Sequence, residues 1–357
     1  MIFRRAALRE FASTAAAVSA ALVVILVTII LIRLLSQAAG GRVPADAVVA
    51  LIGFSALNHL PVVLALSTFI AVLLSLTRSY RDSEMVVWFA SGLPLTAWLN
   101  PVLRFAIPVA LVVGGMSLFL SPWAQGQAAE YRKQLENRDE VSQVSPGMFR
   151  ESASAQRVFF VESVSTDDGK VRNVFINQTQ AGHQSVTVSA EGVIEQAPNG
   201  DRFAVLLNGR RYEGEPGTAS FRVTRFDRYA IRIEPREVGE IELTPKITQT
   251  PDLLALPTPA NLGELSWRIG LPVATVLLAL LAIPLSFVNP RAGRTNNMLF
   301  AVLTFAAYVN FMGIAQAWIS QGKMSPHIGL WVVHAFMFVL LLVLFGWRLA
   351  PNLRRSQ

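Results

Sequence analysis

The feature that most constrains this chain is a set of six long apolar stretches, three near each end of the sequence. Each is long enough to cross the ~30 Å hydrocarbon core of a bilayer, which takes about 20 apolar residues in a helix. They are residues 12–35, 60–77, 102–120, 269–288, 298–319 and 328–347. Only 15% of the residues are charged, whereas soluble domains carry about 25%. The sequence therefore predicts a protein with six membrane-spanning helices.

The sequences around the first and second apolar stretches lead to two further predictions. Residues 47–57, directly before the second stretch, are expected to lie at the membrane interface, with Pro61 marking a break. The first stretch follows Arg4, Arg5 and Arg9, as a secretion signal does, but it is longer than the roughly 7–15 apolar residues of such signals. It is therefore interpreted as an uncleaved first membrane helix.

The basic residues of the short loops predict the orientation, because Lys and Arg accumulate on the cytoplasmic side of a membrane protein. One side collects most of them: Arg4, Arg5, Arg9, Arg78, Arg81, Arg104, Arg291, Arg294, Arg348, Arg354 and Arg355. The other side has Arg33, Arg42 and Lys323, with Arg268 where the central region ends. We expect both termini to be cytoplasmic. The region between the third and fourth stretches then lies in the periplasm of a Gram-negative bacterium.

The net charge of +7 is distributed unevenly. Residues 124–265 hold 16 Lys and Arg against 20 Asp and Glu, a net charge of −4, and the rest of the chain carries +11. Because the central region is mildly acidic and has no basic stripe interleaved with aromatic residues, nucleic-acid binding is not expected. The chain has no cysteine, which excludes disulfides, thiolate catalysis and Cys-based zinc sites.

The central region is expected to be an all-β domain. Short runs of β-branched and aromatic residues recur along it, at residues 158–161, 171–176, 186–188, 203–207 and 229–233. Asn208-Gly209 is typical of a two-residue type I′ hairpin turn. Such strands predict a sandwich, jelly roll or open barrel. The expected domains are residues 1–123, 124–265 and 266–357, with 124–140 and 244–265 as connectors.

The sequence lacks the motifs that would indicate catalysis. It contains no G-x-x-x-x-G-K-[ST], no H-E-x-x-H and no G-x-S-x-G. The histidines have no metal-ligand spacing: His59, His183, His327 and His334. His334, Asn310 and Gln316 lie within predicted spans, where interhelical hydrogen bonding is the first interpretation and substrate contact the second. No enzyme activity, cofactor or metal is expected on this chain.

A short segment on the cytoplasmic side, between the second and third predicted spans, reads Asp82-Ser83-Glu84-Met85-Val86-Val87-Trp88-Phe89-Ala90-Ser91-Gly92-Leu93-Pro94. Asp82 or Ser83 can cap a helix, and Glu84 suits its first turn. Gly92 followed by Pro94 ends it. Two alternatives remain open. The apolar face of this helix rests on lipid, or it docks into a groove of a cytoplasmic ATPase.

Arg33 stands at the outer end of the first predicted helix. The common explanation is that its long side chain extends to the headgroup layer. It also departs from the positive-inside rule. It can therefore contact a phosphate of an anionic lipid instead, because the planar guanidinium binds phosphate through two hydrogen bonds. Arg42, Arg268 and Lys323 are weaker candidates for the same contact.

Three segments resemble the lipopolysaccharide export permeases of the LptF/LptG family. They are residues 82–93, residues 264–269 entering the fourth span, and residues 284–294 leaving it. The resemblance covers essentially the whole chain, and Asn289-Pro290-Arg291 is closer to the F-type than to the G-type members. It implies a helical membrane protein with six transmembrane helices and an inserted periplasmic β-jellyroll.

The same resemblance implies a complex with an LptG-like permease subunit, an LptB-like ATPase dimer that uses ATP and Mg²⁺, and an LptC-like periplasmic subunit. Such a complex extracts lipopolysaccharide from the inner membrane and passes it to a periplasmic bridge toward the outer membrane. Arg33 would lie near the lipopolysaccharide headgroup, and Glu84 would be central to the ATPase contact. The ATPase-docking residues implied are Ser83, Glu84, Met85, Val86, Val87, Trp88, Phe89, Ala90, Ser91 and Gly92.

Two other classes of protein are alternatives. One is another ABC-type export or mechanotransmission permease, of the lipoprotein-release or division-site kind, which usually has four spans per subunit. The other is a membrane scaffold without a transport role, which would need no helix for docking an ATPase.

Overall fold

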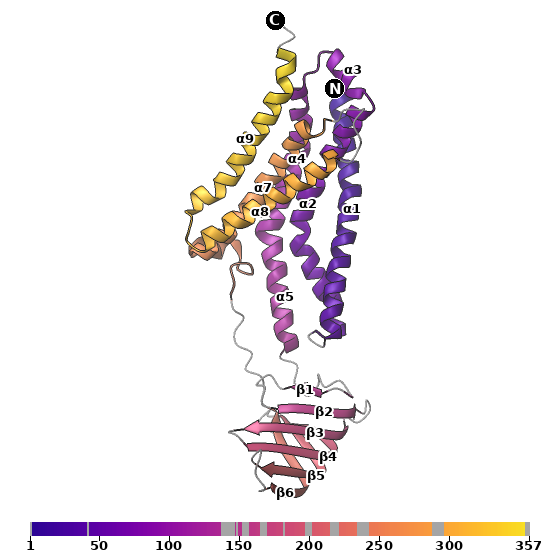
Figure 1. Cartoon of the computed structure of the whole chain (residues 1–357), viewed down its shortest axis with the longest axis vertical. Helices are drawn as coiled ribbons and strands as arrows, with labels where there is room; N and C mark the ends of the chain where they lie inside the picture. The colour runs from indigo at the N-terminus through magenta and orange to yellow at the C-terminus, as the bar shows by residue number, and fades with distance from the viewer. Residues whose placement is uncertain are drawn as a thin grey trace. The chain divides into compact units, whose positions relative to one another are not determined.

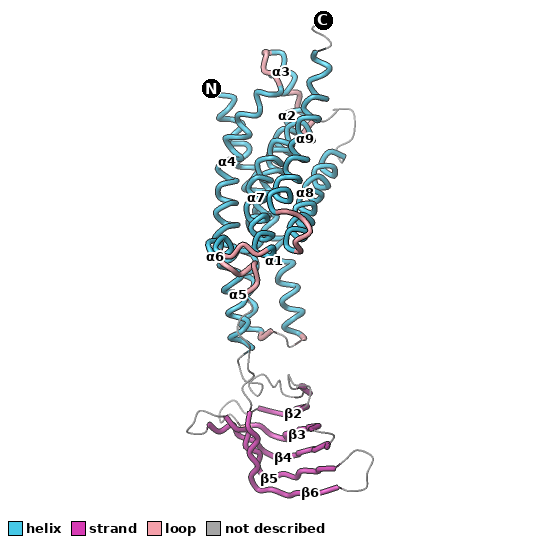
Figure 2. The backbone as a smooth tube through the Cα atoms, turned by 90° about the vertical axis from the view of Figure 1, so that its left-hand side faces the viewer, coloured by secondary structure: helices cyan, strands magenta, loops and turns pink. Residues whose placement is uncertain are grey.

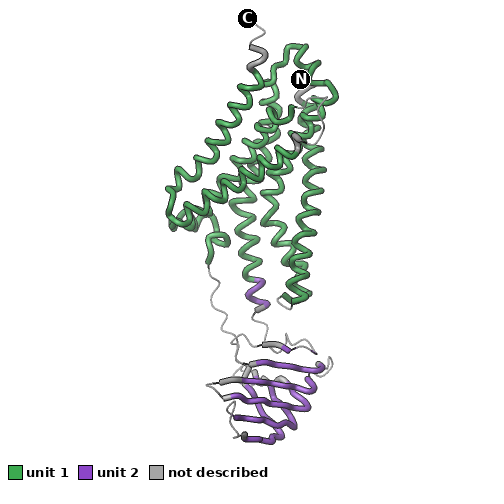
Figure 3. Tube along the Cα trace, viewed as in Figure 1, with its two compact units in different colours: residues 1–130, 242–357 green, residues 131–241 purple. Residues whose placement is uncertain are grey.

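The computed structural model describes residues 2–40, 43–136, 147, 149–151, 157–164, 170–180, 183–196, 202–214, 221–233, 243–287 and 296–353. The chain divides into two compact units (Figure 3). Residues 1–130 with 242–357 form a helical unit, and residues 131–241 form mainly a β domain. Residues 124–130 of the first predicted connector and the whole of the second, 244–265, therefore belong to the helical unit.

Within the described residues, six helical segments are long and apolar enough to cross a membrane, which confirms the predicted number (Figure 1). Five of them consist of α1 (Ile2–Ala39), α2 (Val48–Arg81), α7 (Pro259–Leu285), α8 (Asn296–Ser320) and α9 (Pro326–Leu353). The remaining segment begins in the short helix before α4 and joins α4 (Leu99–Gly115), the π-helix η3 (Met116–Leu120) and α5 (Ser121–Glu136). The short helices η1 (Ala45–Ala47), α3 (Glu84–Ala90), η2 (Leu95–Trp98) and α6 (Thr250–Ala255) complete the unit.

The break predicted at Pro61 is wrong. Helix α2 runs without interruption from Val48 to Arg81, with Pro61 buried inside it, so residues 48–57 are its first turns. Proline is tolerated in membrane helices where neighbouring groups supply other hydrogen-bond partners for the backbone. The carbonyl group that loses its helical donor is that of Leu57, four residues before Pro61.

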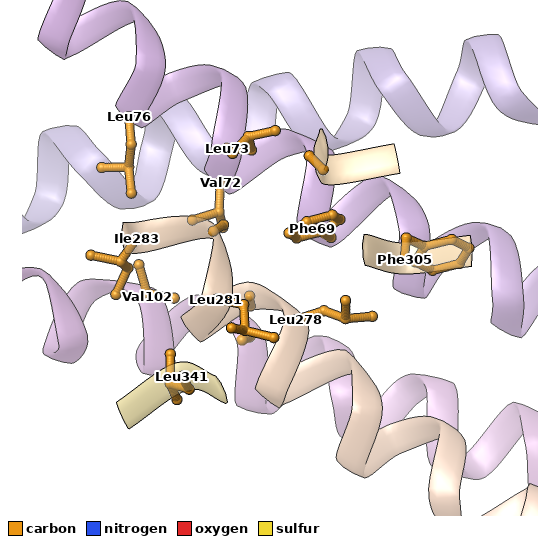
Figure 4. Packing of buried hydrophobic residues seen from close by; sticks show 14 of the residues in the cluster. Phe69, Val72, Leu73, Leu76, Val102, Leu278, Leu281, Ile283, Phe305 and Leu341 are labelled. Atoms are coloured by element: carbon orange, nitrogen blue, oxygen red, sulfur yellow. The ribbon is translucent and has the colours of Figure 1, made fainter. Parts of the chain in front are cut away.

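The core of the helical unit forms around α7, which packs against α2, α4, α8 and α9 (Figure 4). Phe69 and Leu73 of α2 belong to the same buried cluster as Leu278 and Leu281 of α7. Gly263 of α7 allows α8 to approach closely, because a Cβ there would lie 2.0 Å from Ser320 Oγ. Small residues at helix contacts are typical of membrane bundles, in which van der Waals packing drives association.

The first and fifth spans differ from this core because they leave wide apolar surfaces exposed. On α1 the exposed residues include Val24, Ile25, Ile29 and Ile32. On α8 they include Leu299, Phe300, Leu303, Phe311, Ile314 and Trp318. Large exposed apolar surfaces mark contacts with lipid or with another protein.

In its described residues, the inserted domain forms a six-stranded antiparallel sheet in which each strand pairs with its neighbour in sequence (Figure 2). The strands are β1 (Phe149–Glu151), β2 (Arg157–Val164), β3 (Val171–Gln180), β4 (His183–Gln196), β5 (Arg202–Gly214) and β6 (Phe221–Ile233). Each predicted run lies within one of them, so the all-β domain is confirmed. Val161, Val174, Ile176 and Leu206 form its buried core. The finer jellyroll description stays a prediction.

The hairpin predicted at Asn208-Gly209 is wrong, because both residues lie inside β5 and the strand continues to Gly214. Asn208 has a φ of 54°, but the register with β6 is the same on both sides of it, with Leu207 opposite Arg228 and Gly209 opposite Phe226. Glycine is required at 209 for a different reason. A Cβ there would lie 2.2 Å from Cζ of Phe226, so the ring covers the bare backbone.

Replacing Gly209 with valine is expected to destabilise the β domain by about 1–3 kcal/mol, the usual cost of overpacking. The side chain would displace Phe226 and also crowd the carbonyl oxygen of Val188, 2.6 Å from an added Cβ. Hydrogen exchange of the full-length chain in detergent should speed up in peptides from β4, β5 and β6. The matched variant Ala204→Val, on the same strand and pairing Ile231, should change exchange less. Equal exchange in both variants would contradict the packing argument.

Candidate functional site

The segment predicted to dock an ATPase forms α3, which follows α2 directly. The side-chain cap expected from Asp82 or Ser83 is absent. Ser83 has a φ of 60°, the left-handed conformation with which the chain turns from α2 into α3. The carboxylate of Asp82 accepts a hydrogen bond from Nε of Arg81 at 3.1 Å instead.

The end of α3 agrees with the expectation from Gly92 and Pro94. Gly92 has a φ of 85°, and its N–H donates to the carbonyl oxygen of Phe89 at 3.0 Å. The N–H of Leu93 donates to the carbonyl oxygen of Trp88 at 3.1 Å. These two bonds form a Schellman motif, which satisfies carbonyl groups that a helix end leaves without donors.

The inner side of α3 is attached to the first two spans. Met85 is buried in the helical core. The carboxylate of Glu84 accepts a hydrogen bond from Oγ of Ser79 at 2.9 Å and lies 3.7 Å from the guanidinium of Arg78. Arg78 donates two hydrogen bonds of 2.9 Å to Glu10 of α1. Glu84 therefore helps to hold α3 on the bundle.

The outer side of α3 is apolar and exposed. Val86 and Val87 are 65% and 66% exposed, and Phe89 is 41% exposed. We call Val86, Val87, Phe89 and the exposed Ala90 the outer face of α3. The helix thus presents an apolar surface on a firmly attached element, which suits contact with a second surface.

Aromatic contacts connect α3 to the ends of three spans. The ring of Phe89 lies 6.4 Å from that of Tyr80 on α2, and Tyr80 lies 5.4 Å from Phe287, which follows α7. The guanidinium of Arg348 on α9 lies 4.1 Å above the ring of Phe287. Helix α3, the start of α1 and the end of α9 share one end of the helical unit (Figure 1). Force applied to α3 at this end has contiguous contacts through which to reach the bundle.

The candidate lipid-contact residues have different environments. Arg33 is exposed near the end of α1 that is remote from α3, and no ion pair for it occurs among the described residues. Lys323 is exposed in the turn between α8 and α9, and Arg42 lies outside the described residues. The structure contradicts the suggestion for Arg268, which is 1% exposed and fully engaged inside the protein. It is not available to a lipid phosphate.

Arg268 belongs to a buried group that we call the Arg268 cluster: Arg268, Glu264, Thr250, Gln316 and the carbonyl group of Leu118. The guanidinium donates through Nε to Glu264 at 3.0 Å and through Nη1 to Oγ1 of Thr250 at 2.9 Å. Gln316 donates to the other carboxylate oxygen of Glu264 at 3.1 Å. The sequence feature that could have revealed this ion pair is the spacing of four residues between Glu264 and Arg268, which suits an ion pair on one helix.

The interhelical hydrogen bonds predicted for the polar residues within the spans were found for some of these residues. The hydroxyl of Tyr308 on α8 and Nδ1 of His334 on α9 lie 2.6 Å apart, so His334 makes the predicted interhelical hydrogen bond. Gln316 makes one to Glu264 of α7. Asn310 donates to the carbonyl oxygen of Ala306 in its own helix. No interhelical bond of Asn310 occurs in the described part of the chain, so that expectation stays a prediction.

In the described part of the chain, metal-ligating side chains and one small pocket bear on whether a cofactor could bind. None of their His, Asp and Glu side chains gather in threes as metal ligands would. A pocket of ≈ 60 Å³ lies between α1, α2 and α3, lined by Glu10, Ser75, Ser79, Glu84 and Trp88 among others. That volume holds a few water molecules but no organic cofactor.

Within the described residues, six apolar helical segments and an inserted antiparallel β domain define a multi-pass helical membrane protein. Comparison with known proteins narrows this class. The family model for the lipopolysaccharide export system permease LptF/LptG matches residues 5–347. The chain therefore belongs to the LptF/LptG family.

Curated relatives cover almost the same length. The lipopolysaccharide export system permease protein LptF of Escherichia coli (strain K12) is 29% identical over an alignment of 357 positions, which covers 98% of this chain and 96% of the relative. LptF of Shigella flexneri matches with the same identity and coverage. The alternatives of a four-span permease and of a scaffold are not favoured by these matches or by the six candidate spans.

Proposed function

We propose that this chain is the F-type permease subunit of a transporter that extracts lipopolysaccharide from the inner membrane and passes it to a periplasmic bridge toward the outer membrane. Membership of the LptF/LptG family and the full-length similarity to LptF proteins support this function. Each CH₂ group buried in hydrocarbon contributes about 0.8 kcal/mol. Withdrawal of a multiply acylated lipid is therefore steeply uphill and needs an external source of energy.

The observation that carries the proposal is the outer face of α3. The chain has no P-loop motif, so ATP and Mg²⁺ are used on a separate subunit, an LptB-like ATPase dimer. An apolar helix face in a groove is a recurrent mode of protein recognition. The contacts of Glu84 and Met85 hold α3 on the bundle while Val86, Val87 and Phe89 remain exposed. In this proposal α3 is the coupling helix, and Glu84 both attaches it and meets the ATPase.

The remaining partners follow from the exposed surfaces and from the family. The apolar surfaces of α1 and α8 face an LptG-like permease subunit and the acyl chains of the lipid. An LptC-like subunit acts on the periplasmic side. In this arrangement both termini and α3 are cytoplasmic and the β domain is periplasmic, as the distribution of basic residues in the short loops predicts.

Co-purification tests the proposal directly. Tagged protein would be isolated from membranes, and the bound proteins and lipid would be identified by mass spectrometry. We expect a P-loop ATPase, a second six-helix subunit and lipid A in the same complex. Recovery of the chain alone, or with a four-helix lipoprotein-release partner and without lipid A, would contradict the proposed function.

Replacing Arg33 with glutamate is expected to lower lipopolysaccharide transfer by about tenfold, because a charge-assisted hydrogen bond contributes about 1.5–3 kcal/mol and the new carboxylate repels phosphate. Transfer would be measured in proteoliposomes that contain the assembled complex. Arg33→Lys is the matched variant, since it keeps the charge but loses the planar fork, and it should reduce transfer less. Normal transfer by Arg33→Glu would mean that this side chain only extends to the headgroup layer.

A further inference from the structure

The Arg268 cluster joins parts of the chain that are remote in sequence. Residues 244–250, which we call the return segment, bring the chain back from the β domain to the helical unit. Nη1 of Arg268 donates to the carbonyl oxygen of Thr248 at 3.1 Å, and Nη2 donates to those of Pro245 and Lys246 at 3.0 and 3.1 Å. With the bonds to Glu264 and Thr250, the five N–H donors of the guanidinium are all used.

The cluster also reaches the segment through which the chain leaves for the β domain. Leu118 lies in the π-helix η3, and Pro122, four residues later, has no N–H with which to form an α-helical hydrogen bond to the carbonyl group of Leu118. The hydroxyl of Thr250 donates to this carbonyl oxygen and accepts from Arg268. One side chain therefore connects the outgoing π-helix η3 with the return segment.

The third connection runs to α8. Glu264, which is 7% exposed, accepts from Arg268 with one oxygen and from Gln316 of α8 with the other. Close approach of α7 and α8 at Gly263 places these groups within reach of each other. The cluster thus links α7, α8, η3 and the return segment at one buried point.

The energetics indicate what this arrangement contributes. A buried ion pair loses hydration, and apolar residues of the same volume often give equal or greater stability. Stability alone therefore does not account for a buried arginine with this many partners. What it adds is a defined geometry, because the planar guanidinium sets the directions of all its hydrogen bonds.

We propose that Arg268 is a positioning residue of the transport cycle. It fixes the return segment and η3 to α7 and α8, so that movement of these two helices reaches both connections of the β domain together. Without the cluster, the helices would move while the two connections followed independently. This inference rests on the proposed function, because its test measures transport. The proposed function itself assigns no role to Arg268.

The test uses the assembled complex in proteoliposomes loaded with lipopolysaccharide, and it measures lipid transferred to a periplasmic acceptor per ATP hydrolysed. Thr250→Val removes only the bridging hydroxyl at nearly unchanged volume. Arg268→Lys keeps the charge but cannot reach all the carbonyl groups. Lys246→Gln is the matched control, because its exposed side chain changes while its carbonyl bond to Arg268 remains.

A distance between the return segment and α8 tests the positioning role of Arg268 independently of transport. The chain has no cysteine, so spin labels can be attached at Gln249→Cys on the return segment and Ala317→Cys on α8, both exposed positions, in a complex with cysteine-free partners. We expect a narrow distance distribution in the parent and in Lys246→Gln. It should broaden in Thr250→Val and Arg268→Lys.

The proposal predicts that both cluster variants lower the transfer ratio at least about fivefold, the low end of typical coupling between sites, with complex assembly and ATP hydrolysis retained. An unchanged ratio would overturn it, even if the distances broadened. The proposal would also be overturned if transfer fell only in proportion to a loss of assembled complex or of ATP hydrolysis. If the parent complex transferred no lipid, the proposed function would be contradicted instead. In that case the distance measurement would still test the positioning role, which unchanged distances in the variants would overturn.

Discussion

A carboxylate on the outer face of α3 is expected to separate this chain from its ATPase. Val87→Asp places a charge at the centre of an apolar face, where Val87 is 66% exposed and takes no part in the core. Truncating a central residue of an interface costs at least about 2 kcal/mol at hot spots, and a desolvated charge adds to that cost. We expect binding to weaken at least about 30-fold, as measured by ATPase recovery with tagged protein from detergent-solubilised membranes.

The same substitution separates the two interpretations of α3. If the helix rests on lipid, ATPase recovery should stay normal while α3 becomes more accessible to water-soluble reagents. Thr96→Asp is the matched control, because it adds the same charge at an exposed position of η2 outside the outer face. Val87→Leu should preserve binding. Equal recovery with Val87→Asp and Thr96→Asp would contradict docking through this face.

Removing the carboxylate of Glu264 is expected to produce the largest loss of stability in the helical unit. Glu264→Ala leaves the guanidinium of Arg268 charged and 1% exposed without its counter-ion. Breaking one partner of a buried ion pair costs about 3–5 kcal/mol. The unfolding free energy of the purified chain would be measured by tryptophan fluorescence in mixed micelles. The seven tryptophans all lie in the helical unit, so the signal reports that unit.

Two further variants test the cause of that loss. Glu264→Gln should be milder, because its amide oxygen can still accept from Nε of Arg268 although the charge is lost. Glu130→Ala removes an exposed carboxylate from α5 and should change the free energy of unfolding by less than about 0.5 kcal/mol. A loss below about 1 kcal/mol for Glu264→Ala would show that the pair is hydrated rather than buried.

The membrane spans were predictable because their cause is local. About 20 consecutive apolar residues cannot remain in water, and a helix satisfies their backbone groups without outside partners. The strands were predictable for a similar reason, since β-branched and aromatic residues suit a half-buried pleated surface. The stop at Gly92 also followed from local chemistry, because glycine adopts a positive φ without steric cost.

Two of the wrong predictions, at Asn208-Gly209 and at Pro61, have a different cause, which is packing against residues outside the local segment. Asn208-Gly209 has the composition of a turn, but the ring of Phe226 uses the space that glycine leaves inside a continuous strand. Pro61 has the composition of a break, but it lies inside a helix packed on its neighbours. Turn and break signals report local preferences, and tertiary contacts override them by a few kcal/mol.

The features of the candidate site also divide into those that the sequence determines and those that depend on tertiary contacts. The sequence by itself determined the six spans, the inserted β domain, the position of α3 and the candidacy of Arg33, because hydropathy and charge at neighbouring positions are sufficient for each. Only the tertiary structure decided that Glu84 is attached to Ser79 and Arg78 and that Arg268 is buried. The partners of Arg268 lie up to 23 residues away, and Thr250 bonds a carbonyl group 132 residues away. The bonds from Arg268 to the return segment and from Thr250 to Leu118 exist only once packing has brought distant segments together, so no local pattern encodes them.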